Sequence, residues 1–299
     1  MKLSGFTFVR DAVKCEYPIV ESISSILPIV DEFVVNIGLP DIDGTANLIR
    51  SIKDPKIKII QSQWNPNLDM GCYVYTQQAN IALFNCMGKW AFYMQADEVV
   101  HEEDYPIIMD YTDRYIDDDR VDGLVLKQLN FWGDFKTILS VYPKWERRRC
   151  WIVKPHRFVL CAKDASRFTV HPKFKEKGRR LRAVEMDARL FHYHGIKSKK
   201  GLEEKYQTVR QYWEEERIPD KQVDFYQYYP RQFISAYKGN HPEVMAELIQ
   251  KHSVSIDLTS PQWRTELTTK EKKQWRKHKI LQYLPERFSV KRRYDLIRD

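Results

Sequence analysis

The 299-residue sequence predicts an α/β protein with a mixed, mostly parallel sheet flanked by helices. Short apolar runs alternate with segments of helical periodicity from the N-terminus, as in sheets joined by right-handed crossover helices. Hydrophobic residues make up 43% of the chain and aromatic residues 13%, enough for a buried core. After about residue 195 helical patterns dominate. We therefore predict an α/β domain over residues 1–195 and a helical C-terminal region over residues 196–299.

Five runs of the N-terminal part are short, apolar and rich in β-branched or aromatic side chains, which favours strands. These predicted strands cover residues 4–9, 32–38, 56–63, 90–95 and 122–133. The segments between the first four favour helices. In the first of them, Ile19, Ile23 and Ile26 recur at helical spacing after Pro18. The predicted helices cover residues 18–27, 44–52 and 75–86.

The C-terminal region contains three segments with a helical pattern, which cover residues 201–217, 242–252 and 268–284. From residue 271 onward, basic residues are mixed with Trp275, Leu281 and Phe288. This composition suits a peripheral contact with a membrane surface, where a lipid-linked acceptor would lie. Packing of this segment onto the N-terminal domain is the alternative.

The chain carries 49 Lys and Arg against 41 Asp and Glu, a net charge of +8 that favours an anionic partner or reflects a mildly basic surface. Its five cysteines are widely spaced and form no CxxC pair, which argues against a disulfide framework or a zinc site. We find no N-terminal apolar leader and no apolar stretch that approaches the length of a membrane span. We therefore expect a cytoplasmic protein, located at the inner face of the membrane if the C-terminal region binds lipid.

Acidic residues follow three of the predicted strands. Asp11 follows the first strand, Asp41 and Asp43 the second, and the adjacent pair Asp97 and Glu98 the fourth. Two neighbouring carboxylates predict that the chain has reached the surface there. Ligands of open α/β sheets bind at the carboxyl ends of the strands, where such acids can accept ribose hydroxyls or hold a divalent cation. Turn and N-cap roles are the alternative for each acid alone. Together the acids favour a nucleotide site.

The order of these motifs resembles glycosyltransferase family 2, over roughly residues 3 to 200. "SGFTFVRDAVK", "VVNIGLPDIDGT" and "GCYVYTQQANIALFNCMGKWAFYMQADE" follow one another as the family's first strand, acidic Gly-Thr loop, Ala-Arg-Asn-like helix and Asp-X-Asp-type motif do. The resemblance implies the GT-A fold, a nucleotide-sugar donor, a glycan or lipid-linked acceptor of cell-surface polysaccharide biosynthesis, and inversion at the anomeric carbon.

The resemblance also implies site residues. Those that would bind the nucleotide sugar are Thr7, Arg10, Asp41, Asp43, Asn80, Gln95 and Lys197. Asp97 matches the motif's metal-contacting acid, whereas Gln95 replaces its first acid with a neutral amide, so Glu98 is a possible substitute ligand. His194, with His192 as the alternate, matches a late histidine that completes a site for Mn²⁺ or Mg²⁺. Lys197, Lys199 and Lys200 would neutralise the charge on the departing diphosphate.

Inverting transfer needs a carboxylate that takes the proton of the acceptor hydroxyl. In this family the base lies between the Asp-X-Asp motif and the late histidine, which points to Asp164. Asp134 and Glu146 are the other candidates, and an N-cap role is the alternative for Asp164. The basic run at residues 144–158 either lines the acceptor cleft, where it would attract an anionic acceptor, or is an ordinary strand with solvated arginines.

Two other function classes fit parts of the sequence. A nucleic-acid-binding protein would explain the charge of +8, the 17 tyrosines and the 8 tryptophans. However, the tyrosines are scattered, and strand-end acids would repel phosphate, so we expect no nucleic-acid partner. A catalytically inactive relative of the transferases would explain Gln95. Binding of a nucleoside diphosphate separates the transferase from the nucleic-acid-binding protein.

Overall fold

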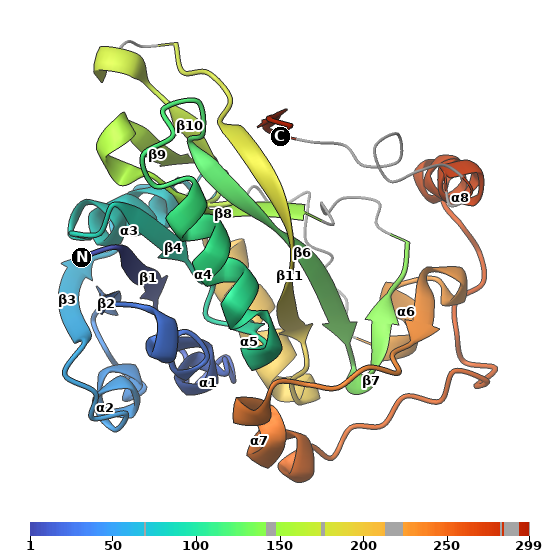
Figure 1. The fold of residues 1–299 in the computed structure, drawn as a ribbon. Helices are drawn as coiled ribbons and strands as arrows, with labels where there is room; N and C mark the ends of the chain where they lie inside the picture. The colour runs from blue at the N-terminus through green and yellow to red at the C-terminus, as the bar shows by residue number, and fades with distance from the viewer. Residues whose placement is uncertain are drawn as a thin grey trace.

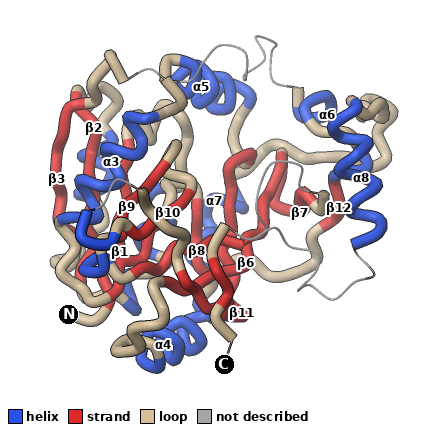
Figure 2. Tube along the Cα trace, turned by 90° about the horizontal axis from the view of Figure 1, so that it is seen from above, coloured by secondary structure: helices blue, strands red, loops and turns tan. Residues whose placement is uncertain are grey.

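The computed structural model describes residues 1–68, 70–141, 148–174, 177–212, 224–281, 283 and 293–298. Within these residues, one 11-stranded mixed sheet forms the centre of the molecule and helices cover it (Figure 1). The predicted mixed α/β fold with flanking helices is confirmed. Figure 2 shows α4 and α5, at residues 105–114 and 199–210, on opposite sides of the strands.

The first half of the sheet is parallel and has the order β3-β2-β1-β4. Its strands are β1 (Leu3–Val9), β2 (Glu32–Leu39), β3 (Ile57–Gln63) and β4 (Trp90–Tyr93). The helices between them are α1 (Ile19–Ser24), α2 (Thr45–Arg50) and α3 (Tyr73–Phe84). All seven elements were predicted, and their ends differ from the prediction by a few residues. The strong periodicity of these segments and their proline and glycine boundaries explain this agreement.

The second half of the sheet is built mainly of antiparallel pairs. Beyond β4 the strand order continues with β8, β6, β7 and β12, while β11 pairs in parallel with β6 and antiparallel with β5. These strands are β5 (Glu98–Val100), β6 (Gly123–Trp132), β7 (Asp134–Leu139), β8 (Arg148–Val153), β11 (Arg182–Gly195) and β12 (Ile234–Ala236). A separate hairpin is formed by β9 (Val159–Ala162) and β10 (Arg167–Val170). Of these strands β6 was predicted, and β8 lies within residues 144–158, for which an ordinary strand was one of the two interpretations.

The C-terminal region is mainly helical, as predicted, but it also completes the sheet. Its helices are α5 (Lys199–Arg210), α6 (Phe225–Tyr228), α7 (Ala246–Lys251) and α8 (Thr269–Leu281), and α4 (Tyr105–Arg114) precedes them in the first domain. Single 3₁₀ turns lie at Leu27–Ile29, Glu102–Asp104, Pro155–Arg157, Pro172–Phe174, Arg231–Phe233 and Glu243–Met245. β12 pairs with β7, and β13 (Asp295–Leu296) pairs with β11. The region therefore shares a sheet with residues 1–195.

The core next to the carboxyl ends of β1 and β4 is aromatic. Tyr93 stacks on Phe6 with ring centres 5.2 Å apart and meets Trp151 edge to face at 5.1 Å. Such pairs add to the stabilisation that comes from burial alone. All five cysteines are free thiols. No described helix is both long enough and apolar enough to cross a membrane.

Candidate functional site

The strand order reverses at β1, with β2 and β3 on one side and β4 on the other. In doubly wound sheets the ligand crevice lies at this point, outside the carboxyl ends of the strands. The loops after β1 and β2 meet there: the Ala12 amide donates to Thr45 Oγ1 at 2.8 Å, and the Lys14 amide donates to Asp43 Oδ2 at 2.9 Å. The predicted convergence of these two loops is confirmed.

Asp43 holds this pair of loops together. Its Oδ1 accepts from the amide and the hydroxyl of Thr45 at 3.1 and 2.6 Å, at the start of α2. Burial alone would raise the pKa of Asp43, but its hydrogen bonds with Thr45 and Lys14 lower it below the usual value. The carboxylate is therefore ionised at neutral pH and bonded to the protein, which is the turn and capping arrangement expected of an Asp at this position.

Asp11 and Asp41 differ from Asp43, because each has a buried oxygen to spare. Oδ1 of Asp11 and Oδ1 of Asp41 have no hydrogen-bond partner among the described residues. Burial raises the pKa of Asp11; Arg10 opposes this shift and Asp43 adds to it. Buried polar atoms without partners are rare in folded proteins, and each calls for an explanation. Here two acceptors at the crevice are available to the N–H or O–H groups of a ligand.

Arg10 lies against an aromatic cluster at the same edge. Its guanidinium lies 5.5 Å from the ring centre of Trp64, and Nη1 donates to the Tyr212 hydroxyl at 3.2 Å. Trp64 directly follows β3, and its ring centre lies 5.5 Å from that of Tyr212. A Cβ at Gly38 would come within 2.3 Å of Trp64 Nε1, so only glycine allows this packing. The sequence analysis missed Trp64, although its place after a predicted strand was a usable signal.

Asp97 is buried, and so is its neighbour Glu98. The two residues are 4% and 0% exposed, so the prediction that the chain reaches the surface at this pair was wrong. Oδ2 of Asp97 accepts from Lys205 Nζ at 2.7 Å, and Oδ1 lies 3.3 Å from His192 Nε2. Burial alone would raise the pKa of Asp97, but Lys205 and His192 outweigh it and hold the pKa well below the usual range. Its charge is therefore retained inside the protein.

Glu98 points to different partners. It accepts from Trp151 Nε1 at 2.8 Å, from Gln128 Nε2 at 3.1 Å and from the Gln95 amide at 2.9 Å. Burial raises the pKa of Glu98 to about 8. Pairing of β5 with β11 sets this direction, because side chains alternate along a strand. In this geometry Glu98 does not act as the substitute metal ligand beside Asp97.

The two histidines of β11 lie together beside Asp97. His192 contacts Asp97 and its Nδ1 lies 2.6 Å from Asn130 Oδ1. The ring of His194 stacks on His192 at 5.1 Å and lies 5.5 Å from Trp132. Burial lowers the pKa of both histidines, and that of His194 falls well below its usual value. The alternate candidate, His192, is thus the histidine in contact with Asp97, and both rings are neutral at pH 7.

Two lysines bring positive charge to this edge. Lys197 Nζ donates to the Glu16 carbonyl at 2.9 Å and lies 4.3 Å from the ring centre of Tyr17. Lys205 Nζ lies 5.3 Å from the same ring and donates to the His194 carbonyl at 3.3 Å. Burial lowers the pKa of Lys197 to about 7, and Lys205 adds to this shift. The sequence analysis missed Lys205, because a lysine within a charged helix resembles a solvated surface residue.

At the predicted metal site on Asp97 and His194, Lys205 would compete with a metal ion for the Asp97 carboxylate. Both carboxylate oxygens of Asp97 already have partners, one of them a cation. Within the described ranges, no group of three or more His, Cys, Asp or Glu side chains is arranged to hold a metal ion. The side chains do not fit a divalent ion unless Lys205 moves away. Dependence on Mn²⁺ or Mg²⁺ stays a prediction.

Three further predicted ligands have partners within the protein. Thr7 is buried within β1 and its hydroxyl lies 3.3 Å from the Phe8 carbonyl. The Asn80 amide donates to the Cys161 carbonyl at 3.1 Å and accepts from its N–H at 2.8 Å, which ties α3 to β9. The backbone carbonyl of Gln95 accepts a hydrogen bond from Ser22 Oγ at 3.0 Å. Contact of these residues with a nucleotide sugar stays a prediction.

The candidate base Asp164 lies in the turn between β9 and β10. The residues on both sides of it, Lys163 and Ala165, have left-handed backbones with φ of 61° and 55°. Such strain persists only where the surrounding structure enforces it, and it concentrates at functional sites. The Ala165 amide donates to Thr76 Oγ1 at 3.3 Å, which holds the turn on α3. Burial raises the pKa of the Cys72 thiol at the start of α3, and the Asp164 charge adds to the shift.

Of the two alternative bases, Asp134 lies within the described residues and has bonded oxygens. Asp134 Oδ2 accepts from the Ile256 amide at 2.8 Å, and Oδ1 accepts from the Lys136 amide at 3.0 Å. Oδ2 therefore holds the C-terminal region to the sheet, and Oδ1 bonds within β7. Glu146 lies outside the described residues. The turn that carries Asp164 is bonded to Thr76 on α3, and the N–H of Cys72, at the start of that helix, donates to the Tyr212 carbonyl at 2.5 Å. Asp164 is thus the described candidate on the side of the Trp64 cluster.

We use the term strand-end site for Arg10, Asp11, Asp41, Asp97, Lys197 and Lys205. In this site carboxylates with spare oxygens lie on the β1 and β2 loops, and ammonium groups lie beside Asp97. Lys197 Nζ donates to the Glu16 carbonyl at 2.9 Å, and the Asp11 carbonyl accepts from the Cys15 amide at 2.9 Å, so the loop after β1 contacts both parts. The acidic and basic parts are therefore contiguous. Such an arrangement can bind a ligand that carries donor groups at one end and negative charge at the other.

Comparison with known proteins gives fold-level similarity of low extent. No protein-family model and no curated protein matches the chain. Among solved structures, it is similar to S. aureus TarS 1–349 in complex with UDP-GlcNAc, with a TM-score of 0.37 and 16% identity over 55% of this chain and 49% of that chain. The complex of the same protein with UDP gives a TM-score of 0.32 and 20% identity over 44% and 36%. A mycobacterial protein gives 0.29 and 12% over 44% and 41%. The matches span about half or less of those chains.

Proposed function

We propose that the protein is a nucleotide-sugar-dependent glycosyltransferase whose donor binds at the strand-end site. The observation that carries this proposal is the pair of buried carboxylate oxygens, on Asp11 and Asp41, that have no partner among the described residues. They lie where the strand order reverses, next to loops that are bonded to each other. A ligand that donates hydrogen bonds to them would remove the cost of leaving them unsatisfied.

The division of charge in the site supports a nucleoside diphosphate. Asp11 and Asp41 suit the ribose hydroxyls or the N–H groups of a base, which donate hydrogen bonds. Arg10, whose guanidinium lies 5.5 Å from the Trp64 ring centre, offers a planar group on which a base can stack. Lys197 and Lys205, on the β4 side, suit the phosphate oxygens. Thr7, Asp43, Asn80 and Gln95 complete the proposed set, of which Asp43 acts by holding the loops.

The lysines also support a way to stabilise the leaving group. When the bond between the sugar and the diphosphate breaks, negative charge grows on the diphosphate, and a fixed cation in a dry site stabilises it. Lys205 is held by Asp97 at 2.7 Å and Lys197 by the Glu16 carbonyl at 2.9 Å. We propose that these two ammonium groups supply this charge. The predicted divalent ion on Asp97 and His194 would have to displace Lys205, and would then stabilise the same charge as a Lewis acid.

The proposed chemistry is inverting transfer with Asp164 as the base. Its carboxylate would take the proton from the acceptor hydroxyl while the sugar–diphosphate bond breaks on the opposite face of the sugar. The strained turn that presents Asp164, anchored on Thr76, supports a positioned side chain rather than a loose one. A glycan or lipid-linked acceptor, with contact between the C-terminal region and the inner face of the membrane, completes the proposal for a cytoplasmic enzyme.

Thermal unfolding with a panel of nucleoside diphosphates, in Mn²⁺ and in chelator, tests the proposal. At 100 times its dissociation constant, a bound nucleotide adds about 2.7 kcal/mol to the free energy of unfolding. Asp11→Asn and Asp41→Asn should reduce this stabilisation. Asp117→Asn, a control at an exposed acid paired with Lys89, should leave it unchanged. If no nucleotide stabilises the wild type and an oligonucleotide does, the protein binds nucleic acid and the transferase proposal fails.

A further inference from the structure

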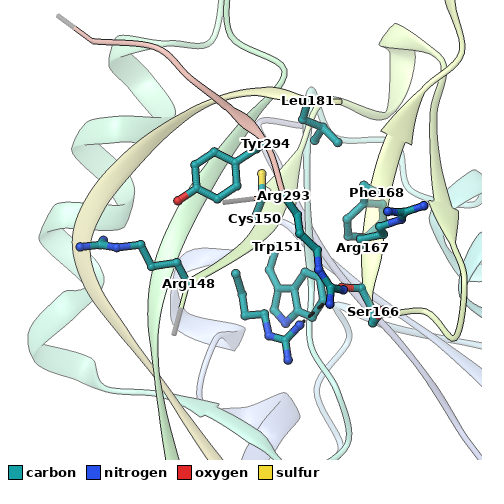
Figure 3. A pocket seen from close by; sticks show the side chains of 10 residues that line it. Arg148, Cys150, Trp151, Ser166, Arg167, Phe168, Leu181, Arg293 and Tyr294 are labelled. Atoms are coloured by element: carbon teal, nitrogen blue, oxygen red, sulfur yellow. Dashed lines mark hydrogen bonds between the residues drawn. The ribbon is translucent and has the colours of Figure 1, made fainter. Parts of the chain in front are cut away.

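A second basic site lies beside the strand-end site. Four arginines line one pocket: Arg148, Arg149, Arg167 and Arg293, together with Trp151 and Tyr294. They come from β8, from β10 and from the C-terminal segment at residues 293–298. Figure 3 shows Arg293 extending beside Trp151 toward Ser166, with Arg167 on the neighbouring strand and Arg148 on the far side. Three separate parts of the chain thus contribute arginines to the lining, although the Arg148 side chain points away from Arg167 and Arg293. We call this the arginine pocket.

The floor of the pocket is made rigid by a β-bulge. Leu124 pairs with Ile152 while the next residue, Val125, pairs with Cys150, so Trp151 is the extra residue on β8. Bulges of this kind redirect a side chain and are common next to active sites. Trp151 Nε1 donates to Glu98, and the Phe168 ring meets the indole edge to face at 5.9 Å. The indole is therefore fixed beneath the arginines.

The arginines are positioned before any ligand arrives. Arg149 lies 5.2 Å from the ring centre of Trp151, and its Nε donates to Gln128 Oε1 at 2.8 Å. Arg148 is 6% exposed and pairs with Glu185 at 3.6 Å. Arg293 precedes Tyr294, whose hydroxyl donates to Glu185, and β13 then ties this segment to β11. Little side-chain freedom remains to be lost on binding, which favours affinity.

One guanidinium nitrogen in the pocket lacks a partner. Arg167 Nε is buried and has no hydrogen-bond partner among the described residues. A buried donor on a charged group is costly to leave unsatisfied, and an oxyanion would satisfy it. The planar guanidinium matches two oxygens of a phosphoryl group at once, which a lysine does not. Local charge, rigidity and an unsatisfied donor all point to the same class of ligand.

The pocket adjoins the proposed catalytic base along the chain. Ser166, whose carbonyl lies 3.5 Å from Arg149 Nη1, follows Asp164 by two residues in the same turn. A molecule with an anionic group in the pocket would thus lie next to Asp164. We propose that the arginine pocket is an anion site, distinct from the strand-end site, that binds a phosphoryl group of the acceptor. The role of acceptor rests on the proposed transferase function; the anion site does not.

Calorimetric titration of the full chain with inorganic phosphate tests the site. The titration is done in saturating nucleoside diphosphate, which occupies the strand-end site. Arg167→Gln and Arg293→Gln should each raise the dissociation constant of phosphate by about tenfold or more, because each removes a charge-assisted hydrogen bond. Arg50→Gln, the loss of one charge at an exposed position on α2, is the matched control and should change little. Circular dichroism checks that each variant folds, and Arg293→Gln keeps the test valid if Arg167→Gln does not.

A second arm separates this proposal from the proposed function. Lys205→Met should weaken nucleoside diphosphate and leave phosphate binding at the arginine pocket intact, whereas Arg167→Gln should do the reverse. If phosphate binding is lost in Lys205→Met and kept in both arginine variants, the phosphate occupies the strand-end site and the anion-site proposal is overturned. If phosphate binds in the arginine pocket but no nucleotide binds anywhere, the anion site stands and the acceptor role is overturned with the transferase function.

Discussion

The adjacent carboxylates of Asp97 and Glu98 contact different regions, Asp97 the strand-end site and Glu98 the arginine pocket. Asp97 is paired with Lys205 and His192, whereas Glu98 contacts Trp151, which lines the arginine pocket. The strand-end site mixes acids with lysines, whereas the described residues that line the arginine pocket include four arginines and no acid. A site of mixed sign can recognise the polar and the anionic ends of one ligand, while a pocket of one sign selects anions alone. The difference indicates two ligands rather than one extended cleft.

The largest effect should come from the residue between the two regions. Asp164→Asn removes the proton acceptor but keeps the side-chain shape, so we expect transfer to slow by about 10² to 10⁴. Donor binding and phosphate binding should both stay near the wild-type values, because Asp164 belongs to neither site. Rates of sugar transfer, beside calorimetry of each ligand, provide the check. The control is Asp187→Asn, at an exposed acid paired with Lys127. Transfer at the wild-type rate would move the base elsewhere.

Of the two adjacent acids, we expect Asp97 to have the large effect on the free energy of unfolding when it is replaced. Asp97→Asn leaves Lys205, whose side chain is 15% exposed, without its counter-ion, and the cost of breaking a fully buried pair, about 3 to 5 kcal/mol, is the upper limit of the expected loss. The double variant Asp97→Asn with Lys205→Met removes both charges and should recover part of this loss. Chemical denaturation of the three variants measures it. Equal stability of the Asp97→Asn variant and the wild type would show that Lys205 does not depend on Asp97, and would reopen Asp97 to a divalent ion.

Binding in the strand-end site should depend on pH in a way that the arginine pocket does not share. Lys197, whose neighbours include Lys205, Asp97, Cys15 and Glu16, has a pKa of about 7. Its charged form binds diphosphate, so affinity should be constant below pH 7. Above that pH, binding must take up a proton, and affinity should fall by up to about tenfold per pH unit. Calorimetry from pH 6 to 9 tests this. Lys197→Met should flatten the profile, and phosphate binding to arginines, which stay charged, should not follow it.

The last expected effect comes from Glu98, and it grows as the pH rises from about 5 to 8. Its pKa in the folded protein, about 8, lies above the ordinary value, so its favourable contribution to stability is complete below pH 4.5. That contribution declines as the pH rises toward 8, because the unfolded chain releases the proton earlier. Glu98→Gln should therefore resemble the wild type in its free energy of unfolding near pH 5 and lose less stability between pH 5 and 8. If the free energies of unfolding of the two proteins change equally between pH 5 and 8, the pKa of Glu98 is ordinary.

The first half of the fold could be predicted because its signals are local. The strands β1 to β4 and the helices between them depend on apolar runs, helical spacing and turn residues that lie within a few positions of one another. The short strand β5 carries Glu98, and its strand state comes from pairing with residues 190–192 of β11. The bulged β8 carries Arg149 and pairs with β6, 21 to 30 residues earlier in the chain, and a strand was only one of two interpretations of this segment. Propensity yields to such tertiary context, so β5 was missed.

The sequence alone was sufficient to place acids and bases at the ends of strands, because strand ends and residue types are local properties. Only the tertiary structure decided what each charge does. Asp43 bonds to its own loops, Asp41 keeps a free oxygen, and Asp97 is neutralised by a lysine on a helix 108 positions later in the chain. Arg167 and Arg293 likewise share one pocket although they are far apart in sequence. The physical reason is that burial and charge pairing depend on distance in space, which the packing of the sheet sets.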